Sequence, residues 1–332
     1  MSAEPALRFD HVTIAFPGAD GPLKVVNDVS FAVDSGRCLV IVGDSGSGKS
    51  MACQALLGIV PAPGTVSGRG IFWEGRDLLR SSARDWMKVR GAEIAMVFQD
   101  PAAALNPLMP VGRQIIDVVR AHRPVTRAEA ERRAIEVLNQ VGFPDPERRM
   151  RAYPIELSGG LRQRVAIALA LACGPKLIVA DEATTNLDVS IQAQIIGLLR
   201  SLKEELGISI VFVTHDLGLA PEIGDEVLVM YAGHAVERGP VREVLDQPSH
   251  PYTIGLLNSA PTLESSRAHP LKPIPGQVPA LDEIGAGAPF RSRCPVVVSG
   301  RCDSAKPDWT ACGGDHFVAC HRFAQDGIGG VQ

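Results

Sequence analysis

One stretch of the chain constrains its fold more than any other. It follows the apolar run 39–42, which predicts a buried strand, and it precedes residues 51–57, which predict a helix. A pattern G-x-x-x-x-G-K-S in that position is typical of a phosphate-binding P-loop. Glycines let successive N–H groups point inward, Lys49 brings charge to the β- and γ-phosphates, and Ser50 brings a hydroxyl to Mg²⁺. The predicted loop is Gly43, Asp44, Ser45, Gly46, Ser47, Gly48, Lys49 and Ser50.

Composition indicates a globular protein and argues against two other classes. The chain has 332 residues, 45% of them hydrophobic, which allows a large core in one domain plus an extension or in two domains. Its net charge of −4 argues against a general nucleic-acid binder. The first five residues show no basic region followed by an apolar run, and the longest apolar run, 165–173, is too short to span a membrane. We therefore expect a cytoplasmic protein or one held at a membrane by partners.

The N-terminal residues predict antiparallel strands. Residues 7–14 alternate apolar and polar side chains, 17–22 form a turn-rich loop, and 25–33 alternate again. Phe16 lies where its ring could stack on an adenine or pack on the core. Both interpretations of Phe16 stay open at this stage.

A second region predicts helices. Residues 111–122 and 127–141 have apolar side chains at helical spacing, with charged residues between them. Residues 64–98, in contrast, contain strand-like runs. We expect a helical subdomain at about 103–160, inserted in an α/β domain.

Residues 157–164 open a long apolar helix with a Ser-Gly-Gly sequence. Ser158 is a good helix N-cap, and the following Gly159 and Gly160 allow close approach of another backbone. The segment is either a helix cap alone or a second phosphate-binding helix N-terminus.

Polar residues follow three apolar strands. The strand 177–182 ends in two carboxylates, of which Asp181 fits an Mg²⁺ ligand and Glu182 fits a base that deprotonates a water. Gln99 follows 94–98, and His215 follows 208–214. The carboxyl ends of strands are where α/β sheets bind their ligands.

The C-terminal residues differ in composition. Residues 259–290 are rich in proline and predict an extended linker, and 291–323 hold four of the seven cysteines. Four thiolates are the number that a [4Fe–4S] cluster or a tetrahedral zinc ion needs. The alternative is a set of reduced cysteines in a small subdomain. The cysteines concerned are Cys294, Cys302, Cys312 and Cys320.

These motifs together resemble the ATP-binding subunits of ABC transporters, over about residues 7–245. The resemblance implies a dimer that holds ATP between the P-loop of one subunit and the Ser158–Gly160 stretch of the other. It also implies an α/β P-loop NTPase core with an antiparallel β subdomain and a helical subdomain. The roles that it implies are catalytic base for Glu182, γ-phosphate contact for His215, Mg²⁺ sensing for Gln99, Mg²⁺ binding for Ser50 and Asp181, and dimer contact for Asp188.

A finer resemblance covers nearly the whole chain. Residues 153–154, 230–233, 250–252 and 274–279 resemble the oligopeptide/dipeptide importer ATPases, a group that also serves nickel, opine and related solutes. It implies a nucleotide-binding domain at 1–245 and a C-terminal proline- and cysteine-rich extension at 246–332. It also implies a second, different ATPase subunit, two transmembrane permease subunits and an extracytoplasmic substrate-binding protein. We therefore expect a peripheral protein on the cytoplasmic face of the inner cell membrane, with no nucleic-acid partner.

The chain departs from this family pattern at three places. Ala183 stands where the family has proline, and Asn186 where it has alanine; neither supplies chemistry, so ATPase activity is expected to survive. Ala288 stands at the family's first cysteine, and Cys312 is the expected replacement ligand. The rival functions are a soluble ABC-type ATPase acting on nucleic acid or ribosomes and a nucleotide binder that does not hydrolyse. The transported solute is not encoded in this chain.

Overall fold

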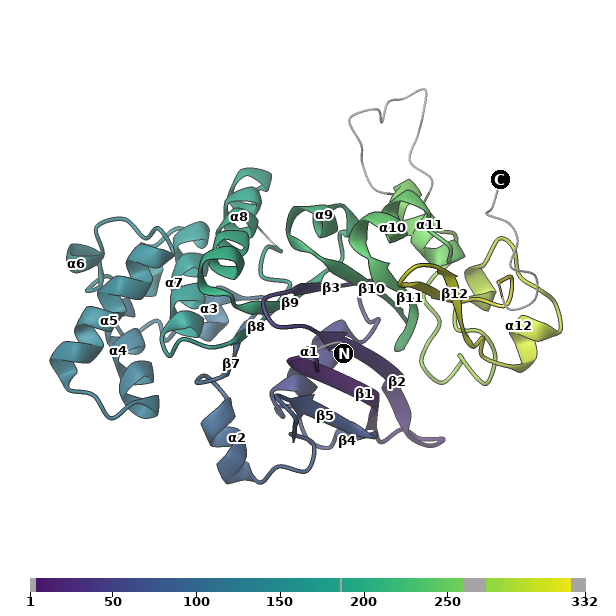
Figure 1. The fold of residues 1–332 in the computed structure, drawn as a ribbon, viewed down its shortest axis with the longest axis horizontal. Coiled ribbons are helices and arrows are strands. Elements are labelled where there is room, and N and C mark those ends of the chain that lie inside the picture. The colour runs from purple at the N-terminus through teal and green to yellow at the C-terminus, as the bar shows by residue number, and fades with distance from the viewer. Residues whose placement is uncertain (1–3, 186, 260–272, 324–332) are drawn as a thin grey trace. The chain divides into compact units, whose positions relative to one another are not determined.

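Strand β3 (Cys38–Val42) leads into the P-loop, and all five of its residues are buried. A continuous apolar strand of this kind needs cover on both faces, which is typical of the parallel part of an α/β sheet. The computed structural model describes residues 4–185, 187–259 and 273–323 (Figure 1). By its internal contacts the chain divides into two units. Unit 1 takes in residues 1–33, 39–79 and 214–332, and unit 2 takes in 34–38 and 80–213.

An antiparallel sheet opens unit 1, in the strand order β2-β1-β5-β6, with β4 paired to β1. Alternate side chains of β1, such as Leu7 and Phe9, are fully buried, because successive residues of a strand face opposite sides of the sheet. The strands are β1 (Leu7–Phe16), β2 (Leu23–Val33), β4 (Thr65–Ser67), β5 (Gly70–Trp73) and β6 (Arg76–Asp77). The predicted antiparallel strands at 7–14 and 25–33 are therefore present.

A second, mixed sheet completes unit 1, in the order β12-β13-β11-β10-β3. Strand β10 runs parallel to β3, and the pairs β10–β11, β11–β13 and β12–β13 are antiparallel. Its other strands are β10 (Glu226–Tyr231), β11 (His234–Pro240), β12 (Trp309–Gly313) and β13 (His316–Ala319). The helices of unit 1 are α1 (Lys49–Leu56), η2 (Leu217–Leu219), α9 (Ala220–Ile223), α10 (Val241–Asp246), α11 (Pro251–Ser259), η3 (Arg291–Arg293) and α12 (Arg301–Ser304).

A fully buried carboxylate joins the last part of the chain to this sheet. Glu237 of β11 accepts hydrogen bonds from the backbone N–H groups of Ser249 (2.6 Å) and His250 (3.0 Å). Its Oε1 also lies 2.7 Å from Nε2 of His316 on β13. A buried carboxylate is tolerated only when its oxygens are satisfied in this way. Glu237 thus fixes both the start of α11 and the hairpin β12–β13.

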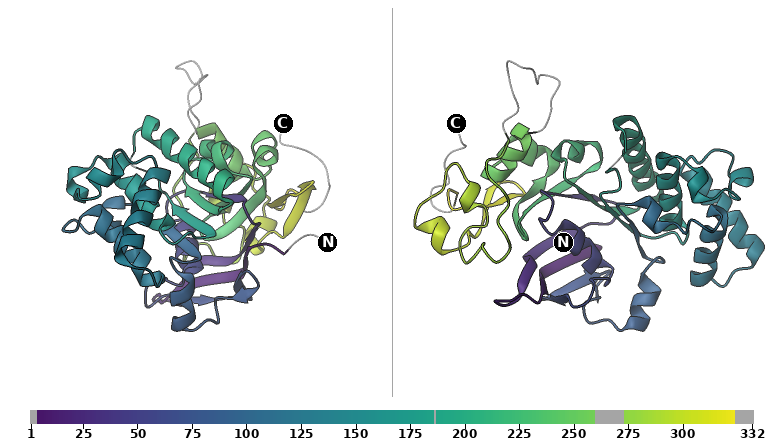
Figure 2. Two further views of the ribbon diagram at one scale, coloured as in Figure 1. Left: turned by 60° about the vertical axis from the view of Figure 1, so that its left-hand side comes forward. Right: turned by 180° about the vertical axis from the view of Figure 1, so that it is seen from behind.

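Unit 2 contains the parallel strands β7 (Ile94–Val97), β8 (Leu177–Asp181) and β9 (Ser209–Thr214), in that order. Its helices α4, α5 and α7 pack on one another, as the teal ribbons of Figure 2 show. The helices are α2 (Ala83–Val89), α3 (Pro101–Ala104), α4 (Val111–His122), α5 (Arg127–Gln140), α6 (Pro146–Arg149), η1 (Pro154–Glu156), α7 (Gly159–Leu171) and α8 (Val189–Leu206).

The structure differs from the sequence prediction at α2. Residues 64–98 were expected to be strand-like, but 83–89 form a helix. Ser82 explains it, because its hydroxyl accepts a hydrogen bond from the Asp85 N–H and so caps the first turn. The predicted domain boundaries at 245/246 and at about 103–160 stay predictions. In the part of the chain that the structure describes, no helix combines the length and apolar character that a membrane span needs.

We predict that stability falls in mild acid because of His250. Its ring is buried, and its Nδ1 accepts a hydrogen bond from the Tyr252 N–H, which requires an unprotonated nitrogen. Burial lowers the pKa of His250 from 6.5 to about 4, against a smaller opposing effect of Glu237. The unfolded chain takes up the proton near pH 6.5, so the contribution is complete above that pH and is lost as the pH falls toward 4. The full loss is roughly 3 kcal/mol.

The test is urea unfolding of the full chain at several pH values between 7.5 and 4.5. His250→Asn keeps an acceptor for the N–H two residues ahead but does not titrate, so its free energy of unfolding should depend less steeply on pH. His234→Asn is the parallel variant, since burial also lowers the pKa of His234 to about 4. If both variants keep the parental pH slope, the prediction is wrong.

Candidate nucleotide-binding site

Glycine is required at two positions of the P-loop. Gly43 and Gly48 have positive φ angles of 158° and 97°. A Cβ atom at Gly43 would lie 2.0 Å from the carbonyl oxygen of Met230, and one at Gly48 would lie 2.3 Å from that of Val25. Both distances are too short for any side chain. The loop therefore takes this shape only with glycine at both places.

The loop ends at the start of α1, which has Gly48 as its N-cap and no side-chain cap. Uncapped N–H groups at a helix start, together with the helix dipole, favour a bound anion. Lys49 is 4% exposed, and its ammonium donates to the carbonyl oxygens of Gly43 (2.7 Å) and Asp44 (2.9 Å). The lysine thus lies across its own loop. A Cβ atom at Gly46 would meet no described atom within 4 Å, so the loop is open there. These features fit the phosphates of a nucleotide.

The stretch 230–233 contacts the P-loop and helps to hold its shape. The Gly233 N–H donates to the carbonyl oxygen of Ser47 (3.0 Å), and the Gly233 oxygen accepts from the Asn27 N–H (2.8 Å). The Met230 oxygen is the atom that closes the space at Gly43. These contacts explain the 230–233 motif, which the sequence alone identified only through its resemblance to the importer family.

In unit 2, two side chains donate hydrogen bonds to one carboxylate. Glu182 follows β8 with a positive φ of 46°, and its N–H donates to the Val213 oxygen (3.1 Å). Its Oε2 accepts from Gln99 Nε2 (3.0 Å) and Thr185 Oγ1 (3.2 Å). Asp181, the last residue of β8, is 6% exposed. The structure thus brings together Gln99 and Glu182, which the sequence singled out separately, and adds Thr185.

The Ser-Gly-Gly stretch and Asp188 each begin a helix in unit 2. Ser158 caps α7 through the Leu161 N–H (3.4 Å), and Asp188 caps α8 through the Ile191 N–H (2.9 Å). A Cβ atom at Gly160 would lie 2.9 Å from a methyl carbon of Ile191, so the start of α7 lies against the first turn of α8. Ser158, Gly159 and Asp188 are exposed. The cap interpretation of Ser158 is confirmed, and the phosphate interpretation stays a prediction.

The remaining predicted site residues lie in unit 1 or outside the described part. His215 follows β9 and is exposed. Phe16 is half-buried, and a Cβ atom on Gly64 would lie 2.7 Å from its ring. Adenine stacking by Phe16 stays a prediction. Asn186 lies outside the described residues.

The prediction of a four-cysteine metal centre is not supported. Among residues 4–185, 187–259 and 273–323, no group of three or more His, Cys, Asp or Glu residues is arranged to hold a metal ion. Strand register separates one pair of the four cysteines: Ala319, next to Cys320, pairs with Trp309, three residues before Cys312. Three residues of strand span about 10 Å, so the hairpin separates these two thiols. The neighbours of Cys312 are instead Ser249 and Glu237, and burial raises its pKa.

Two residues that the sequence did not assign to the site contact the P-loop. The Arg293 Nη1 lies 3.3 Å from Asp44 Oδ2, and the hydroxyl of Tyr252 accepts from the Asp44 N–H (2.7 Å). Burial, and then the Asp44 carboxylate, raise the pKa of Tyr252. Arg293 is 249 positions from Asp44 in the sequence, and no local pattern signals such a contact.

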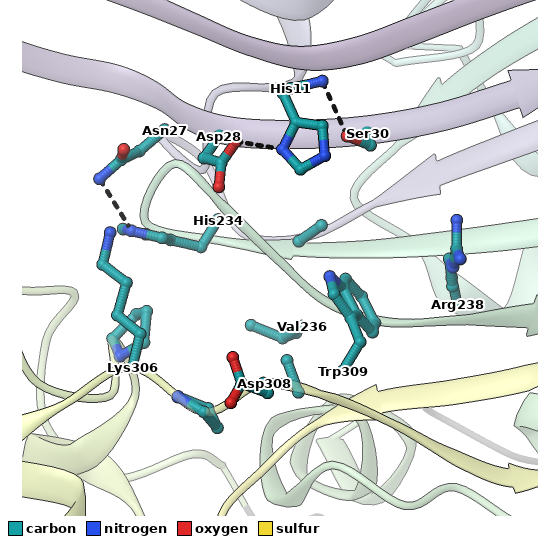
Figure 3. Close-up of a pocket in the computed structure, with 14 residues that line it drawn as sticks. His11, Asn27, Asp28, Ser30, His234, Val236, Arg238, Lys306, Asp308 and Trp309 are labelled. Atoms are coloured by element: carbon teal, nitrogen blue, oxygen red, sulfur yellow. Dashed lines mark hydrogen bonds and ion pairs between the residues drawn. The ribbon is translucent and has the colours of Figure 1, made fainter.

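A pocket of about 420 Å³ lies elsewhere in unit 1 (Figure 3). His11 Nδ1 and Asp28 Oδ1 form a hydrogen bond on one side of it (2.7 Å), and Asn27 contacts His234 (3.1 Å). Lys306 also lines it, and burial lowers the pKa of this lysine. Its lining contains none of the predicted nucleotide-site residues.

Comparisons with known proteins identify the family. Residues 26–185 match the ABC transporter family model, and residues 236–302 match the model for the oligopeptide/dipeptide transporter C-terminal region. The chain is 45% identical over 305 residues to the oligopeptide transport ATP-binding protein OppD of Salmonella typhimurium, covering 92% of this chain and 90% of that protein. It is 48% identical over 288 residues to OppD of Bacillus subtilis, covering 86% and 80%.

A solved structure shows the same fold. The dimeric ATP-binding cassette MJ0796, bound to ADP and phosphate, matches with a TM-score of 0.62 at 28% identity, covering 71% of this chain and 99% of that one. Members of the ABC transporter family hydrolyse ATP. The similarity to the OppD proteins also includes the C-terminal region of this chain. The chain therefore belongs to the ABC transporter ATPases, among the ATP-binding subunits of the oligopeptide/dipeptide transporter family.

Proposed function

We propose that this chain is the ATP-hydrolysing subunit that powers an importer of peptides or related small solutes. The observation that carries the proposal is the match of one chain to both the ABC transporter model and the oligopeptide/dipeptide C-terminal region. An ATPase that acts on nucleic acid or ribosomes finds no support in these similarities. The proposal includes the C-terminal extension at 246–332. Glu237, which precedes this extension, holds α11 and β13 in place through its contacts with Ser249, His250 and His316.

Each site residue has a proposed role that suits its chemistry. The P-loop and Lys49 bind the phosphates of ATP, and Ser50, Gln99 and Asp181 hold Mg²⁺, whose preferred ligands are oxygens. Glu182 takes the proton of the attacking water. Its hydrogen bonds to Gln99 and Thr185 support this role, because they fix the direction of the carboxylate.

The proposed transporter also contains other subunits. Ser158, Gly159, Gly160 and Asp188 are exposed or half-exposed, as residues that face a second ATPase subunit would be. The OppD relatives are named as oligopeptide transport proteins, which supports two permease subunits and a substrate-binding protein as further partners. We place the chain peripherally on the cytoplasmic face of the inner membrane, in a heterodimer of ATPases.

The first test concerns Glu182. Glu182→Gln removes the base but keeps the size of the side chain, so ATP binding should persist while the hydrolysis rate falls by about 100-fold or more. The measurements are Mg-ATP affinity by calorimetry and steady-state phosphate release, both made on the assembled transporter. Hydrolysis at the parental rate would place the base elsewhere.

Two further variants calibrate that experiment. Glu204→Gln changes an exposed glutamate of α8 and should leave hydrolysis unchanged. Lys49→Ala should instead remove ATP binding itself, because the phosphates lose their charged partner. Near-normal affinity in Lys49→Ala would remove the P-loop assignment.

A second prediction follows from the proposed shared site. The isolated chain should hydrolyse ATP slowly, since each complete site needs the Ser158–Gly160 stretch of another subunit. Adding the matching second ATPase and the permease pair should raise the rate at least about tenfold. Size-exclusion chromatography with light scattering, run beside the activity assay, gives the assembly state. Full activity in a stable monomer contradicts the prediction.

A further inference from the structure

The second residue of the P-loop is held from two directions by the C-terminal part of the chain. The Asp44 carboxylate pairs with Arg293 (3.3 Å), whose side chain is only 8% exposed. The Asp44 N–H donates to the Tyr252 hydroxyl (2.7 Å). All three residues belong to unit 1. Both the charge and the backbone of Asp44 therefore have partners outside the loop.

The arginine that reaches Asp44 is itself fixed. Its Nε donates to the Pro275 oxygen (2.9 Å) and its Nη2 to the Ile274 oxygen (3.3 Å). A guanidinium with its other nitrogens bonded to backbone has few alternative positions. Arg293 is therefore held in one position beside Asp44 and does not move freely as a surface arginine would.

The hydroxyl that receives the Asp44 N–H is equally well held. The ring of Tyr252 packs on Tyr231 and Phe290, with centroid distances of 4.7 Å and 5.4 Å. Phe290 precedes η3, the short helix that contains Arg293. The tyrosine and the arginine therefore share one aromatic support.

Electrostatics gives these contacts a consequence for nucleotide binding. A carboxylate in a loop built to bind polyphosphate repels its ligand unless a cation neutralises it, and like charges in a partly buried site are poorly screened. Asp44 is 31% exposed at its side chain, so water screens it only in part. Arg293 supplies the neutralising charge.

We propose that Arg293 and Tyr252 are positioning residues of the nucleotide site, which neutralise Asp44 and fix its backbone so that the P-loop is ready to bind ATP. The C-terminal region thereby tunes ATP affinity without contacting the nucleotide. The inference depends on ATP binding, which belongs to the family, and not on the transported solute. Its test therefore fails or succeeds independently of the import proposal.

The experiment measures the dissociation constant of Mg-ATP for the full chain, by calorimetry, together with the melting temperature. Arg293→Ala should raise the dissociation constant about fivefold, and less at high salt. Asp44→Asn should bind ATP more tightly than the parent, because Arg293 then lies beside the loop without a carboxylate. The double variant Asp44→Asn/Arg293→Ala should return to within about twofold of the parent.

A matched control separates positioning from general loosening. Arg291 lies two residues before Arg293 and donates to the backbone oxygens of Ile284, Ala288 and Glu283, not to the P-loop. Arg291→Ala should lower the melting temperature while the ATP dissociation constant stays at the parental value. If Arg291→Ala and Arg293→Ala weaken ATP binding equally, or if Asp44→Asn does not relieve the loss in Arg293→Ala, the proposal is overturned.

A conservative second variant keeps the test valid if Arg293→Ala does not fold. Tyr252→Phe retains the aromatic packing and removes only the acceptor of the Asp44 N–H. It should raise the dissociation constant about threefold at an unchanged melting temperature. Parental affinity in Tyr252→Phe overturns the assignment of Tyr252.

Discussion

The P-loop depends on a close approach between backbones that leaves no room for side chains. Strand β10 brings the Met230 oxygen to Gly43, and strand β2 brings the Val25 oxygen to Gly48. Gly233 is confined in the same way, with its Cβ position 3.0 Å from the Val25 oxygen. Because the surrounding strands impose the shape, the loop is organised before any ligand arrives, and binding does not have to order it. Both sheets of unit 1 are in this sense part of the nucleotide site.

Local sequence signals were sufficient for the helices that carry them. Apolar spacing at 111–122 and 127–141 predicted α4 and α5 almost to the residue. Thr126 and Glu129 also form a reciprocal cap at the start of α5, which fixes its first residue. Residues 83–89 are short and lack a clear periodicity, so their helix was missed. The hairpin β12–β13 was missed for a different reason, since its pairing with β11 depends on a contact some eighty residues away.

The candidate site likewise contains some features that are local in sequence and others that depend on distant residues. Motifs with fixed spacing, such as 43–50 and Asp181-Glu182, could be recognised in the sequence because their residues are neighbours along the chain. The hydrogen bond from Gln99 to Glu182 joins residues 83 positions apart, and the Arg293–Asp44 pair joins residues 249 apart. The cysteines show the limit of such motifs. Their number predicted a metal centre, but number carries no geometry, and the strand register places Cys312 away from Cys320.

Glu182 shows how the structure holds a strained residue at a site of proposed chemistry. A positive φ is uncommon for a residue with a side chain and costs of order 1 kcal/mol or more. The strain persists here because its surroundings over-determine it. The N–H is bonded to β9 through Val213, and the carboxylate is bonded to Gln99 and Thr185. Relaxing φ would break these bonds together, so the backbone turn and the direction of the carboxylate are fixed as one unit. Such a unit suits a base that must meet a water in one orientation, and it makes Gln99 a determinant of that orientation as well as a proposed Mg²⁺ ligand.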